Sequence, residues 1–153
     1  MREKSLILVV DDEADMLDIA KARLTAGGYE VATAIDAEMA YKKAKELKPD
    51  LMLLDIRMPG INGTEALLDF KNNADIKDTP IAFFTNLTVP WPGVGVENEK
   101  FAKELGAVTI IDKSKDMDQL ADVVKKILND VSKNNLKRDI EKEVDKLGSD
   151  EKN

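Results

Sequence analysis

The chain has 153 residues, the usual size of one domain, with 43% hydrophobic residues, 35% charged residues and a net charge of -7. This acidic balance provides no basic face for phosphate binding, so nucleic acid is not expected as a direct partner. The chain has neither cysteine nor histidine, which excludes disulfide frameworks, thiolate or imidazole metal sites, and catalytic groups built on those residues. The apolar run that begins at Leu6 is too short for a signal sequence or a membrane span, so we expect a cytoplasmic protein that does not contact membranes.

Short apolar runs alternate with helix-length segments along the chain. In chain order, predicted strands at residues 6–10, 29–34, 51–54, 81–84 and 108–111 are each followed by a predicted helix, at residues 13–26, 36–47, 63–72, 97–105 and 116–131. Continuous apolar strands are typical of a parallel sheet that is buried on both faces. The alternation therefore predicts an α/β doubly wound fold, a five-stranded parallel sheet with helices on both faces.

Polar residues follow the predicted strands at the edge where doubly wound sheets carry their functional sites. Asp11 and Asp12 follow the first strand, Asp55 the third, Thr85 the fourth and Lys113 the fifth. Three converging carboxylates would repel one another, and a hard divalent cation with oxygen ligands would offset that repulsion. The sequence therefore predicts a Mg²⁺ site made by the three aspartates.

The same residues fit one kind of chemistry. Asp55 could attack a phosphoryl group as a carboxylate nucleophile and form an aspartyl phosphate. Lys113 would place a positive charge against the phosphoryl oxygens, and the Thr85 hydroxyl could hydrogen-bond to another of them. Positioning and electrostatics suffice for this reaction, so the chain needs no histidine of its own.

Separate motifs in the chain resemble, in order, those of bacterial response-regulator receiver domains. They are Val9-Val10-Asp11-Asp12-Glu13, Leu53-Leu54-Asp55-Ile56-Arg57-Met58-Pro59-Gly60 with Gly63, Phe84-Thr85, Leu105-Gly106-Ala107 and Ile111-Asp112-Lys113. The resemblance covers residues 5–130 and implies the strand order 2-1-3-4-5 of the flavodoxin-like fold.

The resemblance also implies roles and partners. Asp55 would be the phosphoacceptor, Asp12 a direct Mg²⁺ ligand, Asp11 a ligand through water, and Arg57 a ligand through its backbone carbonyl. A sensor histidine kinase or phosphotransfer protein would supply the phosphoryl group, and a downstream protein target would read the state by contact. Such a domain is not an enzyme in the ordinary sense, because it catalyses only its own phosphorylation and dephosphorylation.

Four features depart from the family pattern. Ile111 stands where the family usually has an aromatic residue that changes rotamer on phosphorylation, and Asn86 stands where a small residue is usual. Ser114 replaces the usual proline after the lysine, so we expect a trans peptide bond there. The loop 87–96 is longer than usual and contains Trp91, which is either a packed anchor or part of a partner-docking or lid element beside the phosphorylation site.

The sequence predicts a receiver domain at residues 1–131 and a charged extension at 132–153, helical to about residue 147 and disordered beyond it. We expect a stand-alone receiver, with no room for an output domain. The extension carries apolar residues at spacings of four, four and three: Leu136, Ile140, Val144 and Leu147. It is either a solvated or packed extension of the last helix, or a helix for homodimer formation or kinase docking.

Two other functions remain open at this stage. The departures at Ile111, Asn86 and Ser114 would permit a receiver-fold adaptor in which phosphorylation is secondary or lost. A phosphatase of the haloacid-dehalogenase type would also use aspartate and magnesium. It expects its nucleophile in an Asp-X-Asp pair after the first strand, however, whereas Asp11 and Asp12 are adjacent and the candidate nucleophile follows the third strand.

Overall fold

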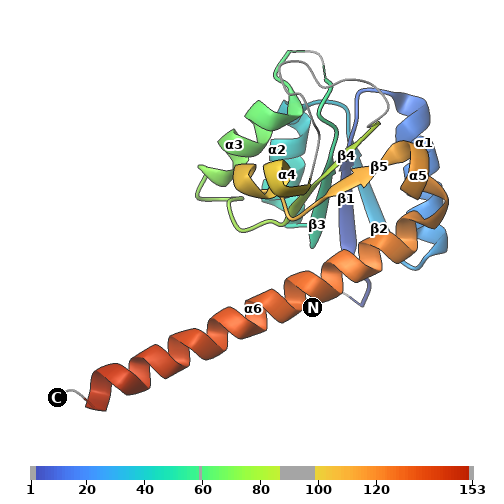
Figure 1. Cartoon of the computed structure of the whole chain (residues 1–153). Coiled ribbons are helices and arrows are strands. Elements are labelled where there is room, and N and C mark those ends of the chain that lie inside the picture. The colour runs from blue at the N-terminus through green and yellow to red at the C-terminus, as the bar shows by residue number, and fades with distance from the viewer. Residues whose placement is uncertain (1–2, 59, 87–98, 152–153) are drawn as a thin grey trace.

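The structure, a computed structural model, describes residues 3–58, 60–86 and 99–151. Its centre is a five-stranded, wholly parallel sheet in the order β2-β1-β3-β4-β5 (Figure 1). The strands are β1 Leu6–Val10, β2 Glu30–Ala34, β3 Leu51–Leu54, β4 Ile81–Thr85 and β5 Ile110–Asp112. The predicted fold class and strand order are both confirmed.

Helices cover both faces of the sheet (Figure 1). On one face lie α2 Ala37–Leu47, α3 Gly63–Lys71 and α4 Glu99–Leu105. On the other lie α1 Ala14–Ala26 and the first half of α6 Leu120–Glu151. The short helix α5 Lys113–Asp116 and the 3₁₀ turn η1 Met117–Gln119 connect β5 to α6.

The apolar strands fill two cores, one on each face, because successive side chains of a strand point to opposite sides. In β1, Leu8 and Val10 pack with α2 and α3, whereas Ile7 and Val9 pack with α1 and α6. All four side chains are buried. A strand enclosed in this way needs apolar residues at every position, which explains the continuous runs in the sequence.

Side-chain caps fix two helices on the first of these faces. The Asp36 carboxylate accepts a hydrogen bond from the Met39 N–H at 2.8 Å at the start of α2. Asn62 Oδ1 accepts from the Glu65 N–H at 3.0 Å at the start of α3. The second cap places α3 directly after the loop that leaves β3.

The chain after β4 differs from the predicted elements. Strand β5 begins at Ile110 rather than at residue 108. Val108 is apolar because it packs against the core, although it lies before the strand. The last predicted helix, 116–131, starts three residues earlier, as α5, and α6 continues to Glu151 instead of ending near residue 147. A single internal glycine such as Gly148 costs a helix only about 1 kcal/mol, which need not end it. The loop 87–96 and its Trp91 lie outside the described residues.

Within the described ranges, no helix is both long enough and apolar enough to cross a membrane.

Candidate functional site

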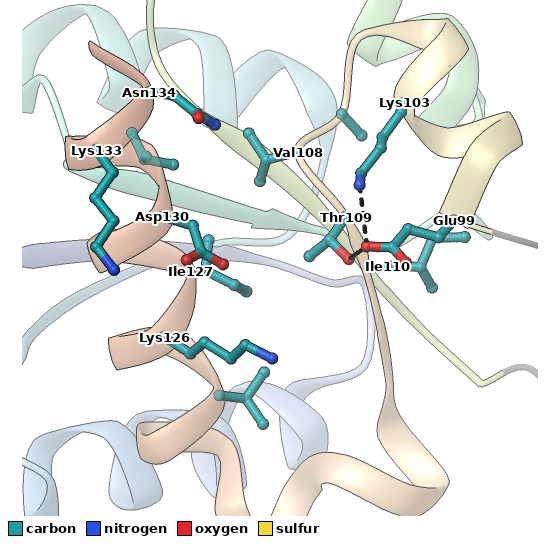
Figure 2. Close-up of a pocket in the computed structure, with 13 residues that line it drawn as sticks. Glu99, Lys103, Val108, Thr109, Ile110, Lys126, Ile127, Asp130, Lys133 and Asn134 are labelled. Carbon is teal, nitrogen blue, oxygen red and sulfur yellow. Dashed lines mark hydrogen bonds and ion pairs between the residues drawn. The ribbon is translucent and has the colours of Figure 1, made fainter. Parts of the chain in front are cut away.

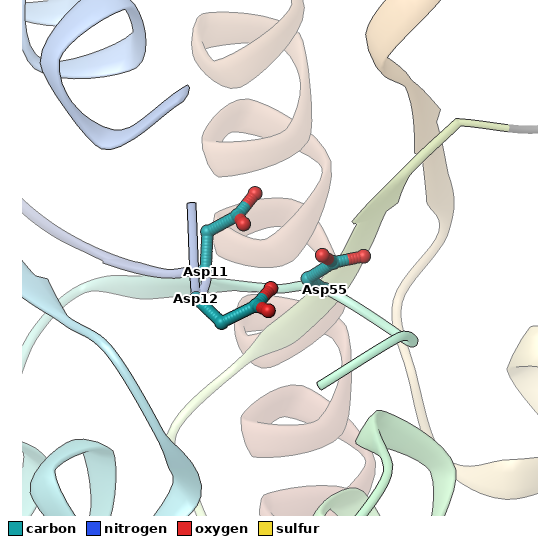
Figure 3. Close-up of side chains that lie close together, drawn as sticks. All are labelled: Asp11, Asp12 and Asp55. Carbon is teal, nitrogen blue, oxygen red and sulfur yellow. The ribbon is translucent and has the colours of Figure 1, made fainter. Parts of the chain in front are cut away.

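Three carboxylates lie together where β1 and β3 end (Figure 3). The two strands are neighbours, and the Asp55 N–H donates to the Val10 carbonyl at 3.0 Å, so the residues that follow them emerge side by side. Asp11, Asp12 and Asp55 each offer an oxygen within 4.8 Å of the others. Asp11 and Asp55 are buried and Asp12 is exposed, so the cluster is open to solvent on one side.

Lys113 reaches this cluster from the end of β5. Its ammonium group forms ion pairs with Asp11 Oδ2 and, at 3.3 Å, with Asp55 Oδ2. It also lies 5.5 Å from the centre of the Phe84 ring. Only 8% of Lys113 is exposed, so these contacts replace its hydration shell.

The electrostatics of the cluster are unbalanced. Burial raises the pKa of the Asp55 carboxyl, Lys113 opposes that rise, and the charge of Asp11 adds to it. Burial by itself would lower the pKa of Lys113, but the hydrogen bonds and charges of Asp11 and Asp55 outweigh it, and the net shift is upward. One lysine thus faces three carboxylates, and an oxygen-binding cation is the group that would offset the remaining charge.

The other predicted site residues lie around this centre. Thr85 is buried at the end of β4, with its Cα beside that of Asp112 in the sheet register. The backbone N–H of Arg57 donates to Asp55 Oδ1 at 3.3 Å, while the Arg57 side chain is exposed. Asn86, which follows Thr85, is exposed.

A hydrogen-bond network that the sequence reasoning missed holds the backbone on both sides of Lys113. Asp112 Oδ1 accepts from the Ser114 N–H at 3.0 Å and from the Ser114 hydroxyl at 2.7 Å. The Asp112 N–H in turn donates to Asp116 Oδ2 at 3.0 Å. The Lys113–Ser114 peptide bond is trans, as predicted, so this network stands where the family usually has a proline. An aspartate two residues before a serine at a helix start was the signal for it.

Gly63 closes the loop that follows Asp55. Its N–H donates to the Ile56 carbonyl at 2.7 Å, and a Cβ atom at this position would lie 2.2 Å from the Asp55 carbonyl oxygen. Only glycine permits this approach without movement of the backbone. The start of α3 therefore fixes the main chain of Asp55.

Ile111, at the family's aromatic position, is completely buried in the core between the sheet and the α1 and α6 helices. Phe84, the residue before Thr85, is buried in the same core.

A separate groove of about 720 Å³ lies between α4 and α6 over β5 (Figure 2). Val108, Ile110 and Ile127 are among its apolar lining residues. At its edge, Glu99 accepts a hydrogen bond from the Thr109 hydroxyl at 3.1 Å and pairs with Lys103 at 3.3 Å. None of the clustered aspartates lines this groove.

The arrangement matches a known family. The model of the response regulator receiver domain family matches residues 7–125. The chain belongs to the response-regulator receiver family. Such domains are signalling domains of two-component systems.

Solved receiver structures share the fold over most of their length. A CheY-like receiver domain protein from Methanospirillum hungatei is 28% identical, with a TM-score of 0.71 over 86% of this chain and 99% of that one. The receiver domain of CheB from Thermotoga maritima is 33% identical, with a TM-score of 0.66 over 83% of this chain and 98% of that one.

Two curated relatives are longer than this chain. A probable transcriptional regulator, ycf27, from Porphyridium aerugineum is 33% identical over 86% of this chain and 51% of its own length. The alkaline phosphatase synthesis regulator PhoP from Bacillus subtilis is 48% identical over 39% of this chain and 25% of its own. The chain thus spans at most about half the length of these two relatives.

Proposed function

We propose that this receiver accepts a phosphoryl group on Asp55 and passes the signal on by protein contacts. The observation that carries the proposal is the buried Asp55 carboxylate, paired with Lys113 and lying beside Asp11 and Asp12. The donor would be a phosphohistidine on a sensor kinase or a phosphotransfer protein. An Asp55 oxygen forms a bond to phosphorus as the phosphorus–nitrogen bond breaks, and the imidazole leaves and takes up a proton.

The donor set fits Mg²⁺, because all of its groups are oxygen atoms and the cluster has more negative charge than its lysine offsets. The side chains of Asp11, Asp12 and Asp55 and the backbone carbonyl of Arg57 would hold the ion. When bound, it supplies charge neutralisation for the transferring phosphoryl group.

The remaining site residues act on the phosphoryl oxygens. Lys113 already lies against the Asp55 carboxylate and would pair with one oxygen of the attached group. The Thr85 hydroxyl would donate to another. Ile111 has no aromatic ring to change rotamer, so we propose that the phosphorylated state is reported by a route other than a rotamer change at this position.

The proposal is tested with acetyl phosphate and Mg²⁺ on the full chain. We expect a mass increase of one phosphoryl group that hydroxylamine removes, since hydroxylamine cleaves acyl phosphates and leaves serine or threonine phosphates intact. The modification should require Mg²⁺ and be absent from Asp55→Asn. Failure of the parent to take up phosphate, or equal uptake by Asp55→Asn, would contradict the proposal.

A non-phosphorylated adaptor and a phosphatase predict other results. The adaptor would bind its partner equally well in the parent and in Asp55→Asn, with no Mg²⁺-dependent modification. The phosphatase would turn over a small phosphate ester many times without accumulating a modified form.

A further inference from the structure

The second half of α6 leaves the domain and exposes a row of aliphatic side chains. Figure 1 shows α6 projecting well beyond the sheet and its covering helices. The row, here called the distal stripe, has exposed fractions of 61%, 55%, 59% and 64% at Leu136, Ile140, Val144 and Leu147. These are the most exposed large hydrophobic residues in the described part of the chain. Exposure of this kind on one face marks a contact surface.

The stripe points away from its own domain. Successive residues of an α-helix are rotated by about 100°, so the nine residues from Ile127 to Leu136 turn the helix by about 180° beyond whole turns. Ile127 is buried against the sheet, and Leu136 is therefore on the far side. Arg138 follows Ile127 by eleven residues, which rotates it only about 20° from Ile127 around the helix, so Arg138 lies on the domain side, opposite Leu136. The domain cannot cover the stripe while α6 remains one helix.

The spacing of the stripe is nearly symmetrical about its centre. From Leu136 to Leu147 the steps of four, four and three residues span eleven residues, which is about three helical turns. The stripe therefore runs almost parallel to the helix axis. In an antiparallel second copy, Leu136 faces Leu147 of that copy, and Ile140 faces its Val144. Two copies of the stripe in antiparallel orientation therefore bring apolar side chains against apolar side chains along the whole stripe.

Charge favours the same orientation. Residues 133–138 contain three basic residues and no acidic one, whereas residues 145–151 contain three acidic residues and one basic residue, a net charge of −2. When Leu136 faces Leu147 of an antiparallel copy, residues 133–138 of each helix lie opposite residues 145–151 of the other, whereas parallel pairing places each charged segment against its own copy. Asp139 and Lys146, seven residues apart on the same edge of the stripe, would face each other across the pair.

We propose that the distal stripe is a self-association surface, through which two copies of the chain pair their α6 helices in antiparallel orientation. Four side chains per copy bury several hundred Å² on each side, on the order of the smallest specific interfaces. The pair is therefore weak and exchanges rapidly, and its population depends on concentration. The contact uses none of the site residues, so it is independent of the proposed phosphorylation.

Sedimentation velocity of the full chain between about 10 μM and 1 mM, a range suited to a weak complex, tests the association. We expect the average mass to rise toward that of a dimer in the parent and to stay monomeric in Ile140→Glu. Leu68→Glu on α3, another exposed aliphatic, is the matched control and should dimerise like the parent. Circular dichroism checks that both variants keep their helix content. A monomeric parent, or a dimer that survives Ile140→Glu, overturns the proposal.

The chain has no cysteine, so single introduced cysteines test the orientation with a short thiol cross-linker. Glu143→Cys lies near the centre of the antiparallel pair and should cross-link to its counterpart. Ser132→Cys would be about 30 Å from its counterpart in that pair and should not. Cross-linking of Ser132→Cys, or of neither variant, contradicts antiparallel pairing.

Charge variants test the predicted cross-pair contacts. Asp139→Lys should weaken dimerisation about threefold, the size expected for exposed ion pairs. Adding Lys146→Asp in the same chain should restore it, because both contacts are then reversed in sign. If a second copy instead bound in the α4–α6 groove, the groove variant Lys126→Glu would change association and the stripe variants would not. That result would also overturn the proposal.

Discussion

Asp112 Oδ1 accepts hydrogen bonds from both the backbone N–H and the hydroxyl of Ser114, and so holds the chain on both sides of Lys113. Lys113, the residue between them, carries the buried ammonium group that pairs with Asp55, and Ser114 stands in place of the family's usual proline.

The first prediction is that Asp112 positions Lys113. Asp112→Ala should slow acetyl phosphate uptake about tenfold, a loss of about 1.4 kcal/mol in transition-state stabilisation, because the lysine is no longer held in place. Asp112→Asn keeps an oxygen acceptor and should retain most of the rate. Mg²⁺ affinity should be similar in both, since the clustered carboxylates are untouched. An unchanged rate in Asp112→Ala, or a matching loss of Mg²⁺ affinity, would show that Asp112 has no specific role.

The second prediction concerns stability and pH. The pKa of Asp55 is raised, mainly by burial, and a carboxyl of this kind stabilises the fold when protonated, a contribution lost as the pH rises through the folded-state pKa. At neutral pH the ionised carboxylate therefore opposes folding. Asp55→Asn should melt a few degrees above the parent in metal-free buffer at pH 7. The difference should shrink as the pH falls toward 3.8, the ordinary pKa of the carboxyl.

Thermal melts from pH 4 to pH 8 in the presence of a chelator measure this effect. Asp12→Asn removes a charge from the exposed side of the cluster and is the control, with a smaller gain expected. A parent that melts at or above the temperature of Asp55→Asn throughout this range would contradict the prediction.

The sheet could be predicted from the sequence because a strand buried on both faces must be apolar at every residue. Strands β1 and β3 have the predicted bounds for this reason. Strand β5 was misplaced, since Val108 is apolar for packing and lies before the strand begins. A run of apolar residues indicates which residues are buried. It does not indicate at which residue the backbone begins to pair with the neighbouring strand.

The carboxylates and the lysine could be placed at one edge of the sheet, because parallel strands end together. Their mutual contacts could not be predicted. The ion pair of Lys113 with Asp11, as well as with Asp55, depends on where the chain turns after β5. That turn is set by hydrogen bonds of Asp112 and Ser114, which have no periodic pattern in the sequence.

The third prediction concerns the buried ion pairs. Lys113→Ala leaves two buried carboxylates without their cation and should lower the free energy of unfolding by about 3 kcal/mol. Lys115→Ala, at an exposed position two residues later, should change it by less than about 0.5 kcal/mol. Urea unfolding measures both. Mg²⁺ should recover part of the lost unfolding free energy in Lys113→Ala, because a bound cation offsets the same charges. If Lys113→Ala lowers the free energy of unfolding no more than Lys115→Ala does, the ion pairs contribute little to stability.

The fourth prediction separates two uses of glycine. Gly63 has a negative φ but no room, since a Cβ atom would lie 2.2 Å from the Asp55 carbonyl oxygen, whereas Gly28 has a φ of 96° and no atom within 4 Å of its Cβ position. Gly63→Ala must therefore move the backbone of Asp55 and should cost about 2 to 3 kcal/mol. Gly28→Ala places an alanine in the unfavourable left-handed conformation without a steric clash, and should lower the free energy of unfolding by about 1 kcal/mol.

Acetyl phosphate uptake under conditions where both variants are folded should distinguish them further. Gly63→Ala should react more slowly than the parent, because the shifted main chain moves the Asp55 carboxylate relative to Lys113. Gly28→Ala, which is remote from the cluster at the end of α1, should react at the rate of the parent. Equal rates in the two variants would show that the cluster tolerates movement of this loop, and that Gly63 serves folding alone.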